Sequence, residues 1–182
     1  SGFLITGILV DTRTLPNRAS TFYMRRTLRI FPLYFGFLFA VFILLPAVEP
    51  FFAQYQLSGA TRTFGGLIDP AAREHQAWFW TYTTNFLLAF NPTALGAYGH
   101  FWSLAVEEQF YLLMPIVLLS VSRPALPVVA IGAIFSAVSL KLATWLSGHE
   151  LSIFLLPFQL EYLGAGCLLA ILSAVVVSWV AL

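Results

Sequence analysis

The chain has 182 residues, of which 59% are hydrophobic and only 9% are charged, and its formal net charge is +1. Soluble domains carry about 25% charged residues, so this composition excludes a water-soluble globular domain. Nine basic against eight acidic residues exclude a nucleic-acid binder, which needs a basic face. One cysteine excludes a disulfide framework and a thiolate metal site, and no metal is expected. The composition therefore predicts an all-α fold: a polytopic transmembrane helical bundle in a lipid bilayer.

Apolar segments predict about five to six membrane helices or half-helices, because a spanning helix needs about 20 mostly apolar residues. In chain order they are residues 1–10, 30–48, 78–90, 106–121, 124–146 and 151–182. The 78–90 segment predicts a short tilted span or a re-entrant piece. We expect Pro32 in the first turn of its helix, where a missing N–H costs little. In the last segment we expect a brief piece ending near Pro157 and a long helix from about Tyr162.

The distribution of arginines predicts the orientation of these spans. An arginine-rich stretch with only Asp11 opposing it precedes residues 30–48, so this side is expected to be cytoplasmic. Residues 50–77 carry mixed charges and turn signals, which predict an outer loop. Both ends of the chain are apolar. We therefore expect residues 1–182 to be part of a single transmembrane domain that is truncated at both ends.

Three arginines stand at the membrane edge of the helix predicted at residues 30–48. Arg25 and Arg29 are four positions apart and share a helix face, and Arg26 lies beside them. Guanidinium groups bind phosphate oxygens in a bidentate manner, which favours a phosphate site. Basic residues also flank cytoplasmic helix ends in membrane proteins of every function, where they contact anionic lipid. Both interpretations remain open at this stage.

The stretch HFWSLAVEEQFY places two adjacent acids at the mouth of an apolar helix. Acids inside a membrane are expensive and mark functional sites by default. Glu107 and Glu108 point about 100° apart on a helix, so they cannot share one role. We expect Ser103 to be the N-cap, with the acids near the positive helix terminus. His100 could act as an acid or base, although a lone loop histidine is more often simply hydrogen-bonded.

A third polar position follows in PFQLEYLGAG, where Glu161 is an isolated acid in a strongly apolar region. Gly164 and Gly166 allow close approach of helices. A packing interface with an interfacial glutamate and a functional acid are both compatible with this pattern.

Together these stretches resemble the acyltransferase-3 family of integral membrane acyltransferases. The segments SGFLITG, RRTLRIFPLY and HFWSLAVEEQFYLLMP occur in the order of that family, and LPFQLEYLGAGCLLA is similar to its later helices. The resemblance covers essentially the whole chain. It implies a multi-pass enzyme of the bacterial inner (plasma) membrane. Such enzymes move an acyl group, often acetyl, from acyl-CoA (acetyl-CoA) to a hydroxyl of a carbohydrate or cell-surface glycan, without a tightly bound cofactor.

The resemblance also implies roles for particular residues. The donor acyl-CoA would be bound by Arg25, Arg26 and Arg29. The reaction centre would be lined or supported by the catalytic candidates Glu107, Glu108, His100 and Ser103. The family's catalytic histidine, which an arginine precedes on the same helix, is expected upstream of the SGFLITG segment. None of His75, His100 and His149 matches its position. The 182 residues by themselves are therefore expected to be inactive.

The alternative from another functional class is a segment of a proton-coupled transporter or flippase. It would use Glu107, Glu108 and Glu161 as a proton path and the arginines as lipid anchors. Many transporters consist of two related halves with interrupted helices, and no such symmetry is visible here. A non-catalytic membrane subunit is the third possibility, for which the polar cluster would have no use.

Overall fold

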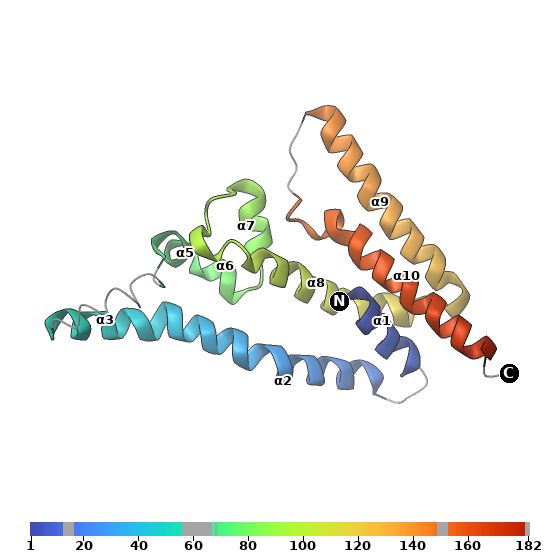
Figure 1. Ribbon diagram of the computed structural model, residues 1–182, viewed down its shortest axis with the longest axis horizontal. Coiled ribbons are helices and arrows are strands. Elements are labelled where there is room, and N and C mark those ends of the chain that lie inside the picture. The colour runs from blue at the N-terminus through green and yellow to red at the C-terminus, as the bar shows by residue number, and fades with distance from the viewer. Residues whose placement is uncertain (13–16, 56–66, 68, 149–152, 181–182) are drawn as a thin grey trace. The chain divides into compact units, whose positions relative to one another are not determined.

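A computed structural model describes residues 1–12, 17–55, 67, 69–148 and 153–180. All regular secondary structure in these ranges is helical, which confirms the predicted fold class (Figure 1). The elements are α1 (Gly2–Asp11), α2 (Arg18–Phe39), the π-helix η1 (Ala40–Leu44), α3 (Leu45–Gln54), α5 (Pro70–Glu74), α6 (Gln76–Trp80), α7 (Thr84–Phe90), the 3₁₀ helix η2 (Gly96–Tyr98), α8 (Phe101–Ser120), the 3₁₀ helix η3 (Arg123–Ala125), α9 (Leu126–Ser147) and α10 (Leu156–Val180).

Four helical stretches within the described ranges are long and apolar enough to cross a membrane. They are Ala19–Phe51, Phe101–Ser120, Arg123–Ser147 and Leu156–Val176. Large apolar side chains point outward from them, with Leu33 80% exposed and Phe135 69% exposed. Such surfaces are stable against hydrocarbon and not against water. The chain is therefore a helical protein of the multi-pass membrane type.

The described residues divide into two compact units, one of residues 1–22 and 105–182 and the other of residues 23–104. In the first unit, α10 packs against both α9 and α1. Glycines permit these close crossings, as the sequence predicts. A Cβ on Gly166 would lie 2.8 Å from the backbone nitrogen of Phe3, and one on Gly164 would lie 3.0 Å from Cγ1 of Ile134.

The first span is longer than residues 30–48, and the prediction that Pro32 occupies its first turn is wrong. α2 begins at Arg18 and carries Pro32 in its interior. The span then continues through η1, where the Leu45 N–H donates to the Ala40 carbonyl five residues back. A proline ring clashes with the carbonyl four residues before it. Because Pro46 follows immediately, the wider π turn relieves that clash while the helix continues into α3.

The C-terminal segment also differs from the prediction. α10 starts at Leu156 and runs unbroken to Val180, so Pro157 lies in its first turn instead of ending a separate piece. A proline is tolerated there because the first N–H groups of a helix have no intrahelical partner. Glu161 is consequently a helical residue, slightly more than one turn inside α10.

In the second unit, residues 78–90 form no single span. α6 ends at Trp80 and α7 begins at Thr84, and each has too few residues to cross a bilayer. Tyr82, in the turn between them, adopts φ 53°, which is a strained conformation for an aromatic residue. Stacking on Tyr34 holds it there, with the two ring centroids 4.1 Å apart.

The outer loop predicted at residues 50–77 is partly helical. Residues 50–54 belong to α3, and residues 70–74 form α5. Residues 56–66 and 68 lie outside the described part of the chain. The side of the membrane on which this segment lies stays a prediction.

Candidate functional site

The arginines predicted to bind the donor lie on one continuous helix, ahead of the apolar part of the first span. Arg25 and Arg29 are exposed and four residues apart, so they share one outward face. The apolar part that begins at Ile30 and ends at Phe51 has 22 residues, or about 33 Å of helix. This length alone crosses a hydrocarbon core of about 30 Å. The two exposed arginines are therefore placed at its edge.

Arg26 differs from its two neighbours because it is half-buried and its Nε atom is buried. It follows the buried Phe22 by four residues and precedes the buried Tyr34 by eight, so all three share the packed face of α2. The hydroxyl of Tyr34 donates to the Phe79 carbonyl at 2.8 Å, which ties this face to α6. The three arginines thus divide into two on an exposed face and one on a packed face.

Asp69, which the sequence did not single out, organises the short elements of the second unit. Its Oδ1 accepts from the N–H groups of Ala71 at 2.9 Å and Ala72 at 3.4 Å, and so caps α5. Its Oδ2 accepts from the Ala97 N–H at 2.6 Å, which joins α5 to η2. The Ala97 N–H above all lowers the pKa of this carboxyl below its ordinary value. Burial, and secondarily the Asp69 charge, raise the pKa of Tyr98, whose hydroxyl donates to the Leu67 carbonyl.

The prediction that Ser103 caps α8 is wrong. α8 begins at Phe101, so Ser103 lies inside the first turn and His100 immediately precedes the helix. The Ser103 hydroxyl donates to the backbone carbonyl of His100 at 3.0 Å and accepts no backbone N–H as a cap would. The His100 ring lies 4.9 Å from the Phe101 ring. The side chains of His100 and Ser103 are both exposed, and the hydrogen bond between these two residues uses the backbone of His100 and not its imidazole.

Glu107 is held by hydroxyl groups. Its Oε1 accepts from Ser1 at 2.8 Å, and its Oε2 accepts from Tyr111, one turn further along α8, at 2.5 Å. This half-buried carboxylate therefore links the start of α1 to α8. Glu108 is also half-buried, and it points about 100° away around the helix. That the two acids have separate roles stays a prediction.

The predicted site residues fall in both compact units. The arginines, His100 and Ser103 belong to residues 23–104, whereas Glu107 and Glu108 belong to the other unit. Their grouping in a single reaction centre stays a prediction.

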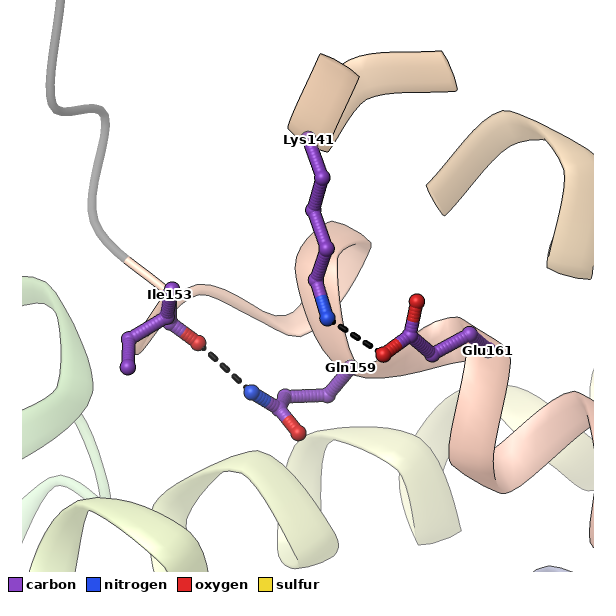
Figure 2. A network of polar contacts seen from close by, with 4 residues as sticks. All are labelled: Lys141, Ile153, Gln159 and Glu161. Carbon is purple, nitrogen blue, oxygen red and sulfur yellow. Dashed lines mark hydrogen bonds and ion pairs between the residues drawn. The ribbon is translucent and has the colours of Figure 1, made fainter. Parts of the chain in front are cut away.

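Glu161, the isolated acid of the last helix, has a cationic partner that the sequence did not identify. Nζ of Lys141 on α9 donates to Oε1 of Glu161 on α10 at 2.5 Å, and the two form an ion pair (Figure 2). Nearby, Nε2 of Gln159 donates to the carbonyl of Ile153 at 2.7 Å, which fixes the entry of the chain into α10.

Sequence reasoning missed three residues that complete these contacts, and a signal existed for two of them. Tyr111 follows Glu107 by four residues, so on a helix it had to lie on the same face. Lys141 lies six residues before the end of α9 and Glu161 five residues after the start of α10. Because α9 and α10 are consecutive and antiparallel, residues at similar depths in the two helices lie side by side. Lys141 and Glu161 are the only charged residues in the sequences of these two helices, so contact between them could be predicted. Ser1 gave no signal, because its contact depends on how α1 packs.

The described residues contain no group of three or more His, Cys, Asp or Glu side chains that could hold a metal ion. The groups with suitable chemistry for a ligand are the exposed guanidinium groups of α2, which suit an anion, and the acids of α8 and α10.

These features define a helical membrane protein with basic residues at one span edge and acids within the spans. The chain matches the model of the acyltransferase domain of the acyltransferase-3 family over residues 1–181. It therefore belongs to this family, as the sequence motifs predict.

Two relatives from Staphylococcus aureus illustrate the match. The O-acetyltransferase OatA of strain NCTC 8325 / PS 47 is 32% identical over 120 residues, which cover 65% of this chain and 18% of OatA. A protein of strain COL named "Putative O-acetyltransferase" is 29% identical over 144 residues, which cover 77% of this chain and 22% of that protein. The chain thus spans about a fifth of the length of these relatives. No solved structure matches it.

Proposed function

We propose that the protein is a membrane O-acyltransferase that moves an acyl group, acetyl first of all, from acyl-CoA to a hydroxyl of a carbohydrate. In this reaction the alcohol oxygen bonds to the acyl carbon and the carbon–sulfur bond of the thioester breaks. The alcohol proton passes through a general base to the leaving thiolate of CoA, so that an ester and free CoA are formed.

The observation that carries this proposal is the family match over residues 1–181. The relatives named O-acetyltransferases support oxygen as the accepting atom and acetyl as the transferred group. A transporter would also use acids within spans, but nothing in the family match favours transport. We therefore prefer acyl transfer to the transporter.

Arg25 and Arg29 support acyl-CoA as the donor. They are exposed on one face at the edge of an apolar span, where the phosphates of CoA stay solvated while a thioester extends toward the bilayer. A guanidinium binds phosphate oxygens through paired N–H groups. Arg26, on the packed face of the same turn, positions that part of α2. Its buried Nε makes it less available to a donor in water.

Glu107 is a positioning residue in this proposal. Ser1 and Tyr111 occupy its two oxygens, so the carboxylate holds α1 in place on α8. We assign removal of the alcohol proton to the histidine that the family resemblance implies upstream of Ser1. The expected location is the bacterial inner membrane, with the arginines on the cytoplasmic side, where acyl-CoA is made.

The experiment uses the full-length protein in membrane vesicles and measures acyl transfer at increasing acetyl-CoA concentration. We expect the double variant Arg25→Ala/Arg29→Ala to raise the KM for acetyl-CoA at least about tenfold, because even one charge-assisted hydrogen bond is worth about 1.5 kcal/mol. Arg73→Ala, which removes an exposed arginine from α5, is the matched control and should leave this KM unchanged. An unchanged donor KM in the double variant would remove the arginines from donor binding.

A further inference from the structure

The Lys141–Glu161 pair lies within the apolar part of two helices. Lys141 is six residues from the end of α9 and Glu161 five residues from the start of α10, which are depths of about 9 and 8 Å along the helices. α9 has 22 residues, or about 33 Å, and barely exceeds a hydrocarbon core of about 30 Å. Both charges therefore lie well inside the edge of the apolar layer.

Charges at such depth are costly, and they are kept where they are paired and have a role. A neutral pair shared by two helices reduces this cost. Purely structural contact between α9 and α10 does not require it, because close packing of small residues at Gly164 already joins them.

The pair is also incompletely enclosed. The Lys141 side chain remains 30% exposed and that of Glu161 20% exposed. The ammonium group lies 5.1 Å from the centroid of the Tyr162 ring, which is itself 69% exposed. Figure 2 shows that the contact from Lys141 reaches one carboxylate oxygen of Glu161 and not the other. Among the described residues, both side chains thus keep part of their surface uncovered, and an aromatic ring lies next to the lysine.

An ammonium offers only donors and a carboxylate only acceptors, whereas an alcohol is both. A single hydroxyl, or two neighbouring ones, can accept from Lys141 and donate to Glu161 at the same time. Hydrocarbon cannot satisfy the remaining N–H groups of the ammonium or the second carboxylate oxygen, so a hydroxyl-bearing ligand is a chemically matched occupant. The adjacent Tyr162 ring supplies an apolar face against which a sugar ring can lie.

We propose that Lys141, Glu161 and Tyr162 form a subsite that binds hydroxyl groups of the carbohydrate acceptor. This assignment deepens the proposed function and rests on it for the identity of the ligand. Lys141 and Glu161 bind the acceptor beside the hydroxyl that is acylated and take no part in the transfer of the proton. The same hydroxyl chemistry is present in the glycerol headgroup of phosphatidylglycerol, which is the alternative source.

The test measures binding, so that it does not depend on turnover. Full-length protein in nanodiscs of phosphatidylcholine, whose headgroup has no hydroxyl, is titrated with N-acetylglucosamine tetramer and with maltotetraose. The variants are Glu161→Asp and the charge swap Lys141→Glu/Glu161→Lys, both of which keep an ion pair and therefore the fold. Ser136→Ala on α9 is the control, because the Ser136 hydroxyl donates to the Ala133 carbonyl of its own helix.

We expect at least one of the two sugars to bind, and we expect both pair-retaining variants to raise its Kd about tenfold, the loss of one charge-assisted hydrogen bond. The melting temperature and the Kd for acetyl-CoA should stay at their wild-type values. Wild-type sugar affinity in both variants would overturn the subsite. If neither sugar binds, and if nanodiscs of phosphatidylglycerol raise the melting temperature of the wild type but not that of the variants, the pair is assigned to lipid instead. A sugar that binds at the pair but is never acylated would refute the proposed function and leave the subsite standing.

Discussion

Two charged regions of this chain meet opposite physical demands. Arg25 and Arg29 are exposed and stand before the apolar part of α2, where the polar edge of a membrane would solvate them. Lys141 and Glu161 stand inside apolar helices, where each charge needs the other. Position relative to the apolar layer, and not residue type, therefore decides whether a charge stands alone or as half of a neutral pair. Substitutions in the two regions should differ accordingly.

The largest effect is expected from Lys141→Met, which leaves the Glu161 carboxylate without its cation in apolar surroundings. Removing one partner of a buried pair costs about 3–5 kcal/mol, and the 30% and 20% exposure of these side chains places the loss near the lower value. Unfolding of the detergent-solubilised protein measures it. The double variant Lys141→Met/Glu161→Leu should recover most of the stability, and Arg25→Ala should change it by less than about 0.5 kcal/mol. A single variant as stable as the wild type would abolish the contrast between the two regions.

A second substitution tests how much the uncharged packing of α10 against α1 contributes to the free energy of unfolding. Gly166→Ala puts a methyl group 2.8 Å from the Phe3 backbone nitrogen, which forces α1 and α10 apart. Overpacking of this kind costs about 2 kcal/mol. Gly132→Ala on α9 is the control, since its added methyl meets nothing within 4 Å. Equal unfolding free energies for the two variants would show that α1 does not pack as closely as described.

A smaller effect is expected where an acid is held by hydroxyls instead of a cation. Tyr111→Phe removes one of the two donors to Glu107 and keeps the ring. A hydrogen bond to a charged acceptor is worth about 1.5 kcal/mol, so the unfolding free energy should fall by about that amount. Tyr55→Phe in the stretch after α3, an exposed position, provides the control. If both variants match the wild type, the Glu107 carboxylate is not anchored by this hydroxyl.

The smallest effect concerns Asp69, a carboxylate outside the spans that backbone N–H groups hold. Its pKa is lowered chiefly by the Ala97 N–H, so its ionised form stabilises the fold. That contribution is fully present above the ordinary aspartate value of about 3.9 and is lost as the pH falls through the lowered folded-state pKa. The stability difference between the wild type and Asp69→Asn should be a few tenths of a kcal/mol near neutral pH and should shrink toward about pH 3. A difference that grows on acidification would have the wrong sign for this account.

The fold class followed from composition because so few charged residues cannot cover a soluble surface. The helix boundaries were less predictable. Hydropathy locates the apolar part of α2 at Ile30, but it says nothing of the polar turns that extend the helix back to Arg18. Ser103 matched the preferred N-cap chemistry, yet the helix starts two residues earlier at Phe101, because aromatic packing of Phe101 against Phe79 and Tyr98 decides the position.

Of the candidate site, the sequence identified the acids and arginines and not their partners. Helical spacing was sufficient to pair Tyr111 with Glu107. The contacts of Ser1 and the strained turn at Tyr82 depend on how segments far apart in the chain pack together, which local sequence patterns do not encode.

The central claim, acyl transfer to a carbohydrate hydroxyl, is tested most directly by following the acyl carbon. Vesicles containing the full-length protein are given acetyl-CoA labelled in its acetyl group together with a cell-surface glycan fraction. The account predicts that the label appears in the glycan as an ester that mild alkali releases, in proportion to free CoA formed. Glycan movement across the membrane with the label still on CoA would contradict the account and would support a transporter.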